Sequence, residues 1–157
     1  SLFGMARAVG ELLVAINRPP AIVAGHSAGA AIALQWATIA STAVPVVGFN
    51  PALTPFEGLA ARLFPALAKL ILVNPFAPRV FARMMRAPGE TERFLTRATG
   101  SRIGADGMRC YRALLGNSRH CDGALEMMAS WDLAALAGQL PDVENPVLLV
   151  HSRGDTA

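Results

Sequence analysis

A short glycine-bounded segment near the start of the chain places a serine where it could act as a nucleophile. Residues 25–29 read Gly-His-Ser-Ala-Gly, a G-x-S-x-G pattern in which the serine occupies a sharp turn between a strand and a helix. Such a turn projects the hydroxyl into open space, and the next backbone N–H can point at a developing oxyanion. We therefore predict Ser27 as the nucleophile and Ala28 N–H as an oxyanion donor, with Gly25 and Gly29 leaving room for neighbouring backbone.

Apolar runs on both sides of this motif predict the elements that position it. Residues 21–25 are typical of a short buried strand, and the small apolar residues that follow the motif are typical of a helix reaching about residue 40. Further buried strands are predicted over 45–49 and 146–150, and a helix over 2–16. Strands alternating with helices indicate an α/β fold with a parallel sheet. The strand–serine–helix order favours a nucleophile elbow of the α/β-hydrolase type over a coincidental glycine-rich turn.

The middle of the chain contains no strand pattern. Residues 51–130 consist of helical pieces separated by prolines, and this segment is too long to be an ordinary connection between two strands. We expect it to form a helical cap over the carboxyl ends of the strands, where ligands bind in such sheets. The predicted division is a hydrolase core with the nucleophile elbow over 1–50, a helical cap over 51–130, and a return to the core with an acid-bearing loop over 131–157.

A nucleophilic serine needs a base, and the base needs an orienting acid. Asp155 follows the last predicted strand, so its carboxylate should face the same rim of the sheet as Ser27, and the order serine, acid, later histidine is that of α/β-hydrolases. The three histidines do not suit the base, because one lies inside the motif, one in the predicted cap and one before the acid (His26, His120 and His151). We expect the triad histidine to lie outside this chain.

Composition limits the remaining classes of protein. With 53% hydrophobic and 16% charged residues, the chain suits a compact domain and argues against disorder. It does not begin with methionine and has few strands for such a sheet, so we expect a fragment of a longer protein. Two cysteines and no cluster with metal-ligand spacing predict no metal and no cofactor. No long apolar stretch or export signal is present, which favours a cytoplasmic location and leaves membrane association open.

A resemblance to a known family is carried mainly by three stretches, residues 25–34, 46–56 and 123–133. The first is generic, whereas the second, where the predicted cap begins, and the third, which reads GALEMMASWDL, are much more specific. They resemble the magnesium-chelatase accessory proteins of bacteriochlorophyll biosynthesis, which are α/β-hydrolase homologues, and the likeness covers nearly the whole chain. The resemblance implies that Ser27 is the elbow serine and that Asp155 is the acid of a His-Gly-x-x-Asp segment, although Ser152 replaces the usual glycine. It also implies a role near magnesium insertion into protoporphyrin, with chelatase subunits as partners.

Charge in the predicted cap suggests a class of ligand. The net charge of +3 conceals eleven basic residues against three acidic ones between residues 62 and 119. Apolar residues interleave with this charge, a combination that suits an amphiphilic anion such as a tetrapyrrole bearing propionates, or an anionic membrane surface. We predict Arg79 and Arg83, one helical turn apart, as substrate contacts. The alternative is a solvated basic face; nucleic acid is not expected, because no binding motif accompanies the charge.

Three interpretations of function remain open at this point. The first is an α/β-hydrolase-fold protein that assists the magnesium-chelatase step as a catalyst or as a handler of a magnesium or free-base protoporphyrin. The second is a capped serine esterase or thioesterase acting on a small hydrophobic acid. The third is a non-catalytic tetrapyrrole-binding module that uses the cap as its working surface. Reaction of Ser27 with a serine-directed probe separates the second from the third.

Overall fold

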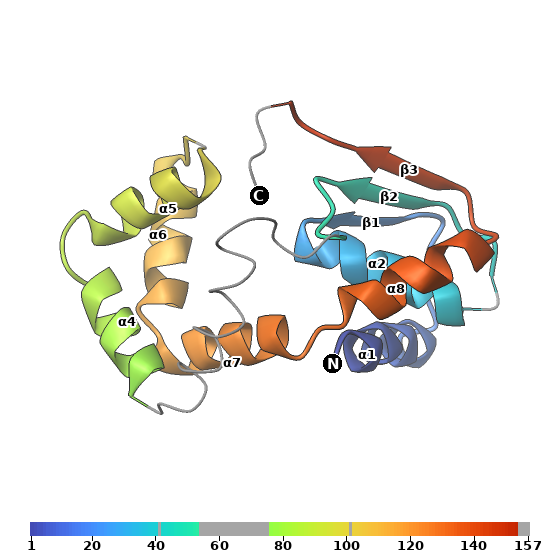
Figure 1. Ribbon diagram of the computed structural model, residues 1–157, viewed down its shortest axis with the longest axis horizontal. Coiled ribbons are helices and arrows are strands. Elements are labelled where there is room, and N and C mark those ends of the chain that lie inside the picture. Colours follow the sequence, from blue (N-terminus) through green and yellow to red (C-terminus); the bar gives the residue numbers. More distant parts are fainter. Residues whose placement is uncertain (41, 54–75, 101, 154–157) are drawn as a thin grey trace. The chain divides into compact units, whose positions relative to one another are not determined.

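The apolar runs predicted as strands form one parallel sheet in a computed structural model of the chain (Figure 1). The structure describes residues 1–40, 42–53, 76–100 and 102–153. The strands are β1 (Val23–His26), β2 (Val46–Phe49) and β3 (Val147–Val150), in the spatial order β1-β2-β3. Val23 pairs with Val46, and Val46 in turn pairs with Val147. Over the described residues the fold is therefore mixed α/β, as predicted.

Two compact units divide the chain. One comprises Ser1–Pro55 with Ser130–Arg153, and the other comprises Phe56–Ala129 with Gly154–Ala157. The sheet belongs to the first unit, so its three strands come from two stretches that are far apart in sequence. The functional labels of hydrolase core and cap stay predictions.

Helix α2 (Ala28–Ile39) is the crossover connection between β1 and β2 and buries almost its whole length. Its small residues allow the helix to lie close to the sheet, because alanine methyl groups occupy little space. Helix α1 (Leu2–Ala15), helix α8 (Leu133–Gln139) and the 3-10 turn η1 (Leu140–Asp142) complete the helical part of this unit. The buried core cluster consists of Leu2, Ala31, Ala33, Leu34, Ala37, Val46 and Leu136.

Apolar side chains are also exposed on this unit. All four residues of β3 are exposed, with Leu148 the most accessible at 58%. In α1 only Leu2 and Ala6 are buried, so most of the apolar spacing that predicted this helix is not used for packing within the described residues. Strand β3 is thus apolar on both faces and lacks a described neighbour beyond it.

A polar clamp joins the amino ends of β2 and β3. The buried side chain of Asn145 donates from Nδ2 to the carbonyls of Thr42 and Val44, each over 2.8 Å. These carbonyls precede β2, whereas Asn145 precedes β3 by two residues. Because a buried amide without partners is unfavourable, these bonds fix the entry of both strands into the sheet.

The described part of the second unit is helical (Figure 1). Its helices are α4 (Ala77–Met85), α5 (Glu90–Thr99), α6 (Ala105–Leu115) and α7 (Ser118–Ala129). Glycines with positive φ stand at both ends of α5, Gly89 at 79° and Gly100 at 63°, where glycine is favoured because it lacks a Cβ. Acidic residues in its first turn, Glu90 and Glu92, complement the helix dipole.

Two side-chain contacts hold α4 against α5. The rings of Phe81 and Phe94 meet edge to face, with centroids 5.4 Å apart. The buried hydroxyl of Thr91 donates to the Met85 carbonyl over 2.8 Å, which satisfies a carbonyl at the end of α4. Of the helices in the described residues, none is long and apolar enough to cross a membrane.

Candidate functional site

Ser27 occupies a backbone conformation that non-glycine residues rarely adopt. Its φ is 52° and its ψ is −117°, and it lies between the last residue of β1 and the first residue of α2. Such a conformation costs about 1–3 kcal/mol and persists only where the surroundings enforce it. The residue is exposed, so its hydroxyl is accessible. This is the strand–turn–helix geometry that the motif predicted.

Backbone hydrogen bonds to both the N–H and the carbonyl of Ser27 hold this turn. The Ser27 N–H donates to the carbonyl of Phe49, the last residue of β2, over 2.9 Å. The Ser27 carbonyl accepts from the N–H of Ala30 over 3.1 Å and from that of Ala52 over 3.2 Å. The serine is therefore fixed on one side by its own helix and on the other by the segment after β2.

The two glycines of the motif differ in what they do. A Cβ added at Gly25 would lie 2.3 Å from the Gly29 carbonyl oxygen and 2.5 Å from the Ala30 nitrogen, so this position requires glycine. A Cβ added at Gly29 would meet no atom within 4 Å. The prediction that both glycines make room for neighbouring backbone is right for Gly25 and wrong for Gly29, because only Gly25 faces the first turn of the helix.

The first N–H groups of α2 are available to a ligand. Within the residues that the structure describes, Ala28 N–H has no hydrogen-bond acceptor, and no side chain caps the helix. Free N–H groups at a helix N-terminus carry partial positive charge and bind anions. Ala28 thus has a backbone donor at the residue that follows Ser27, and its role as an oxyanion donor stays a prediction.

The predicted acid, Asp155, lies outside the described residues. The loop that leads to Asp155 is described as far as Arg153. Asn50 holds this loop through two hydrogen bonds. The Asn50 side-chain Oδ1 accepts a hydrogen bond from the Ser152 N–H over 2.7 Å, and the Asn50 N–H donates to the Val150 carbonyl over 2.8 Å. With φ at 42°, Asn50 has a left-handed backbone that asparagine tolerates better than most residues.

Asn50 is the residue of this site that sequence reasoning missed. Its neighbour Phe49 provides the carbonyl that holds Ser27, so the carboxyl end of β2 and the residue after it contact both the serine turn and the loop after β3. The available signal was an asparagine placed directly after an apolar strand, where left-handed turns favour it.

Over the described residues, no histidine side chain is hydrogen-bonded to Ser27. His26 is exposed at the end of β1, His151 is exposed just after β3, and His120 is exposed on α7 in the second unit. Among the described residues, no group of three or more histidine, cysteine, aspartate or glutamate side chains is arranged to hold a metal ion.

The predicted substrate contacts lie on α4 of the second unit. The Arg79 guanidinium is stacked over the Phe76 ring, 5.7 Å from its centroid, in cation–π geometry. Arg83 is exposed, and its side chain has no ion-pair partner in the described parts of the chain. The structure confirms that both arginines are on one helix, whereas their role as substrate contacts stays a prediction.

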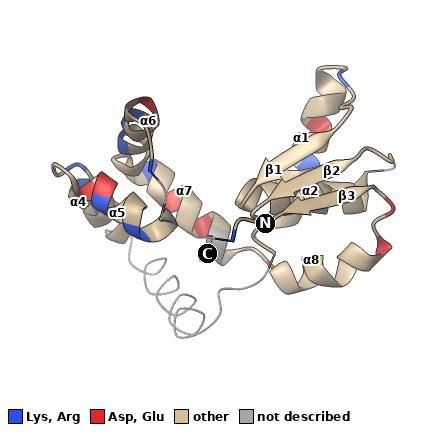
Figure 2. Ribbon diagram, turned by 90° about the horizontal axis from the view of Figure 1, so that it is seen from above, with Lys and Arg blue, Asp and Glu red and all other residues tan. Residues whose placement is uncertain are grey.

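Basic and acidic residues both lie on the helices of this unit (Figure 2). Ion pairs between them balance part of the charge. Glu90 pairs with Arg93, Glu92 with Arg112, and Asp106 with Arg109. The Arg86 Nε donates instead to the Gly116 carbonyl over 2.8 Å. Fewer arginines of this unit therefore have an unbalanced positive charge than the number of arginines in the sequence suggests.

One similar protein gives these observations a context. The chain is 43% identical over 154 residues to the magnesium-chelatase 30 kDa subunit of Rhodobacter capsulatus. The similarity covers 98% of this chain and 53% of that protein, so the chain spans about half the length of the curated relative it matches. No family model matches the chain.

Proposed function

We propose that this chain carries the nucleophile of an α/β-hydrolase-type serine site that acts at the magnesium-chelatase step of bacteriochlorophyll biosynthesis. The observation that supports a nucleophile best is the strained backbone of Ser27, held between the end of β1 and the start of α2. The chelatase step is supported by the 43% identity to a magnesium-chelatase subunit.

In this proposal the Ser27 hydroxyl attacks a carbonyl carbon of the substrate. The bond from Oγ to that carbon forms while the hydroxyl proton passes to a histidine supplied from outside this chain. The N–H of Ala28 donates to the resulting oxyanion, and Asp155 orients the histidine. Asn50 maintains the geometry, since it holds the loop that leads to the acid while its neighbour Phe49 holds the serine.

The substrate or ligand is proposed to be a carboxylated porphyrin. Arg79 and Arg83 on α4 would hold propionate groups, because arginine can bind a carboxylate through two parallel hydrogen bonds. Apolar side chains beside them, Phe76 and Val80, are exposed at 64% and 56% and could cover the ring system. Subunits of the magnesium chelatase are the proposed protein partners.

Covalent labelling of the full-length protein with a fluorophosphonate tests the nucleophile. The wild type should be labelled at Ser27, and Ser27→Ala should abolish labelling without changing the fold. Ser118→Ala is the matched control, because it removes a serine hydroxyl from the other unit. Equal labelling of wild type and Ser27→Ala would reject the assignment.

Fluorescence titration with protoporphyrin and its dimethyl ester tests the ligand. Recognition through charge requires the free acid to bind more tightly, and affinity should fall in Arg79→Ala/Arg83→Ala and at high salt. Indifference to all three changes would reject the porphyrin contact. Tight porphyrin binding without any labelling of Ser27 would instead support a binding module, and labelling without porphyrin binding would support an ordinary esterase or thioesterase.

A further inference from the structure

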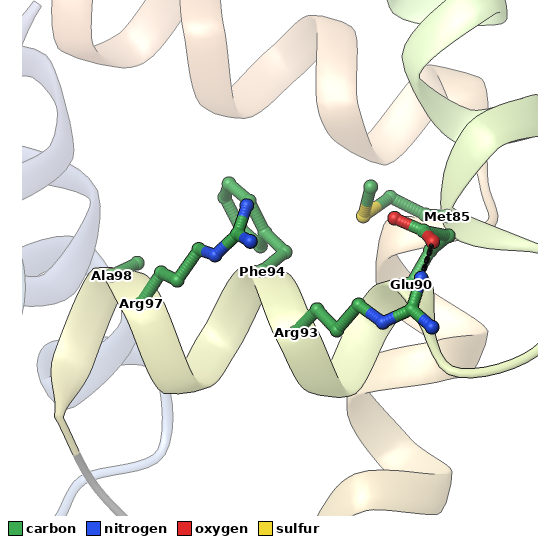
Figure 3. A pocket seen from close by; sticks show the side chains of 6 residues that line it. All are labelled: Met85, Glu90, Arg93, Phe94, Arg97 and Ala98. Carbon is green, nitrogen blue, oxygen red and sulfur yellow. Dashed lines mark hydrogen bonds and ion pairs between the residues drawn. The ribbon is translucent and has the colours of Figure 1, made fainter.

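A groove in the second unit lies along one side of α5 (Figure 3). Its volume is about 360 Å³, near the lower end of the range for small-molecule sites. It is lined by Met85, Glu90, Arg93, Phe94, Arg97 and Ala98. Neither Arg79 nor Arg83 is among these residues, so the groove is separate from the predicted porphyrin contacts on α4.

The apolar part of the groove is held in place by packing. Phe94 is 39% exposed, and its ring is fixed edge to face against Phe81. Met85 is 6% exposed and lies at the end of α4, where Thr91 bonds its carbonyl. A fixed aromatic ring beside a polarizable thioether suits a flat apolar ligand, since neither side chain must be ordered on binding.

The two arginines of the groove are in different electrostatic states. Arg93 forms an ion pair with Glu90, so its charge is largely balanced. Arg97 lies one turn further along α5 and has no ion-pair partner among the described residues. The view in Figure 3 shows the side chains of Phe94 and Arg97 extending to the same side of the helix. The groove therefore combines an aromatic surface with a single unbalanced positive charge.

We propose that this groove binds a monocarboxylate with a flat apolar body, with Arg97 on the carboxylate and Phe94 against the ring. A monoanion balances the charge of Arg97, whereas a second carboxylate would meet Glu90. The inference goes beyond the proposed function, because it requires neither a reactive Ser27 nor a tetrapyrrole.

Isothermal titration calorimetry of the full-length protein with 1-naphthoate tests the proposal. The matched neutral compound is 1-naphthamide, which has the same rings without the charge, and acetate has the charge without the rings. Naphthoate should bind about tenfold more tightly than naphthamide, in line with the strength of charge-assisted hydrogen bonds. Acetate should not compete. Equal binding of naphthoate and naphthamide would overturn the proposal.

Four substitutions locate the site. Arg97→Ala should weaken naphthoate binding about tenfold, whereas Arg119→Ala removes the same charge from α7 and should leave binding unchanged. Phe94→Ala should weaken naphthoate and naphthamide alike. Glu90→Gln should tighten naphthoate binding, because it removes a negative charge from the groove. Equal effects of Arg97→Ala and Arg119→Ala would show that only general charge matters and would overturn the site.

Two checks distinguish loss of naphthoate binding at Arg97 from misfolding and from failure of the proposed serine site. Arg97 is exposed, so its replacement should preserve the far-ultraviolet circular dichroism spectrum, and Arg97→Lys should retain part of the affinity through its charge. Loss of binding in Arg97→Lys equal to that in Arg97→Ala would contradict recognition through the charge at this position. Ser27→Ala should bind naphthoate as the wild type does, whether or not Ser27 is a nucleophile.

Discussion

The side chain of Asn50 accepts a hydrogen bond from the backbone N–H of Ser152 over 2.7 Å and so joins the carboxyl ends of β2 and β3. Asn145 joins the amino ends of the same two strands. The pair of asparagines thus clamps the sheet at both ends, but only the Asn50 end adjoins Ser27, through Phe49.

Replacement of Asn50 should loosen the loop after β3. Asn50→Ala removes the acceptor and leaves a residue that disfavours the left-handed backbone, for a loss of about 1–3 kcal/mol in the free energy of unfolding. Hydrogen exchange of the Ser152 amide should accelerate, while Asn50→Asp, which retains the acceptor, should stay protected. Asn145→Ala is the control, because it removes the hydrogen bonds at the amino ends of the same two strands. It should lower the free energy of unfolding without a selective acceleration of exchange at the Ser152 amide. Unchanged exchange at Ser152 in Asn50→Ala would contradict this account.

Replacement of Ser27 by glycine should stabilise the protein. At a φ of 52° a serine is strained, and glycine is not, so Ser27→Gly should raise the free energy of unfolding by about 1 kcal/mol. Ser27→Ala keeps the strain and serves as the comparison. Urea unfolding of the two variants measures the difference, and Ser27→Gly less stable than Ser27→Ala would argue against strain at this turn.

The two glycines of the motif should respond differently to a methyl group. Gly25→Ala forces a Cβ against the Gly29 carbonyl and the Ala30 nitrogen, so we expect a loss of at least about 2 kcal/mol in stability, because backbone must move. Gly29→Ala meets open space within a helix and should be neutral or slightly stabilising. Thermal unfolding of both variants provides the measurement; equal losses would show that the tight approach at Gly25 is not real.

The second unit should show a stability change at alkaline pH that depends on one thiol. Burial raises the pKa of the Cys121 thiol above the ordinary value of 9.0, and a hydrogen bond from the backbone N–H of Cys121 itself opposes this in part. The folded state therefore favours the protonated thiol. Its contribution to the free energy of unfolding is present below pH 9 and is lost as the pH rises through the raised pKa.

Urea unfolding at pH 8 and about pH 10 measures the loss of stability at alkaline pH. The free energy of unfolding should decrease less in Cys121→Ala than in Cys110→Ala, which removes an exposed thiol and keeps the buried one. In the native protein iodoacetamide should modify Cys110 first, because Cys121 is buried and its Sγ–H donates to the Leu115 carbonyl. Modification of both thiols at one rate would contradict the burial of Cys121.

Local patterns were sufficient to predict the elements that carry the serine. The strands were predicted from short apolar runs bounded by prolines, and the turn from residues 25–29, because strands, helices and tight turns depend on neighbouring residues. The same patterns did not identify Asn50, because its partner Ser152 is 102 residues away. Nor did they predict that Arg112 pairs with Glu92, since sequence spacing indicates ion pairs only within one helix.

The order of synthesis leaves one side of β2 unpaired until late. Strands β1 and β2, with α2 between them, can pair as soon as they leave the ribosome, but β3 follows only after the second unit. At about 5–20 residues per second, the edge of β2 waits on the order of 10 s for its partner. During that interval Val46 and its neighbours offer unsatisfied backbone groups to any extended chain nearby. Chaperone demand during translation should therefore be set by this delay more than by the stability of the finished fold.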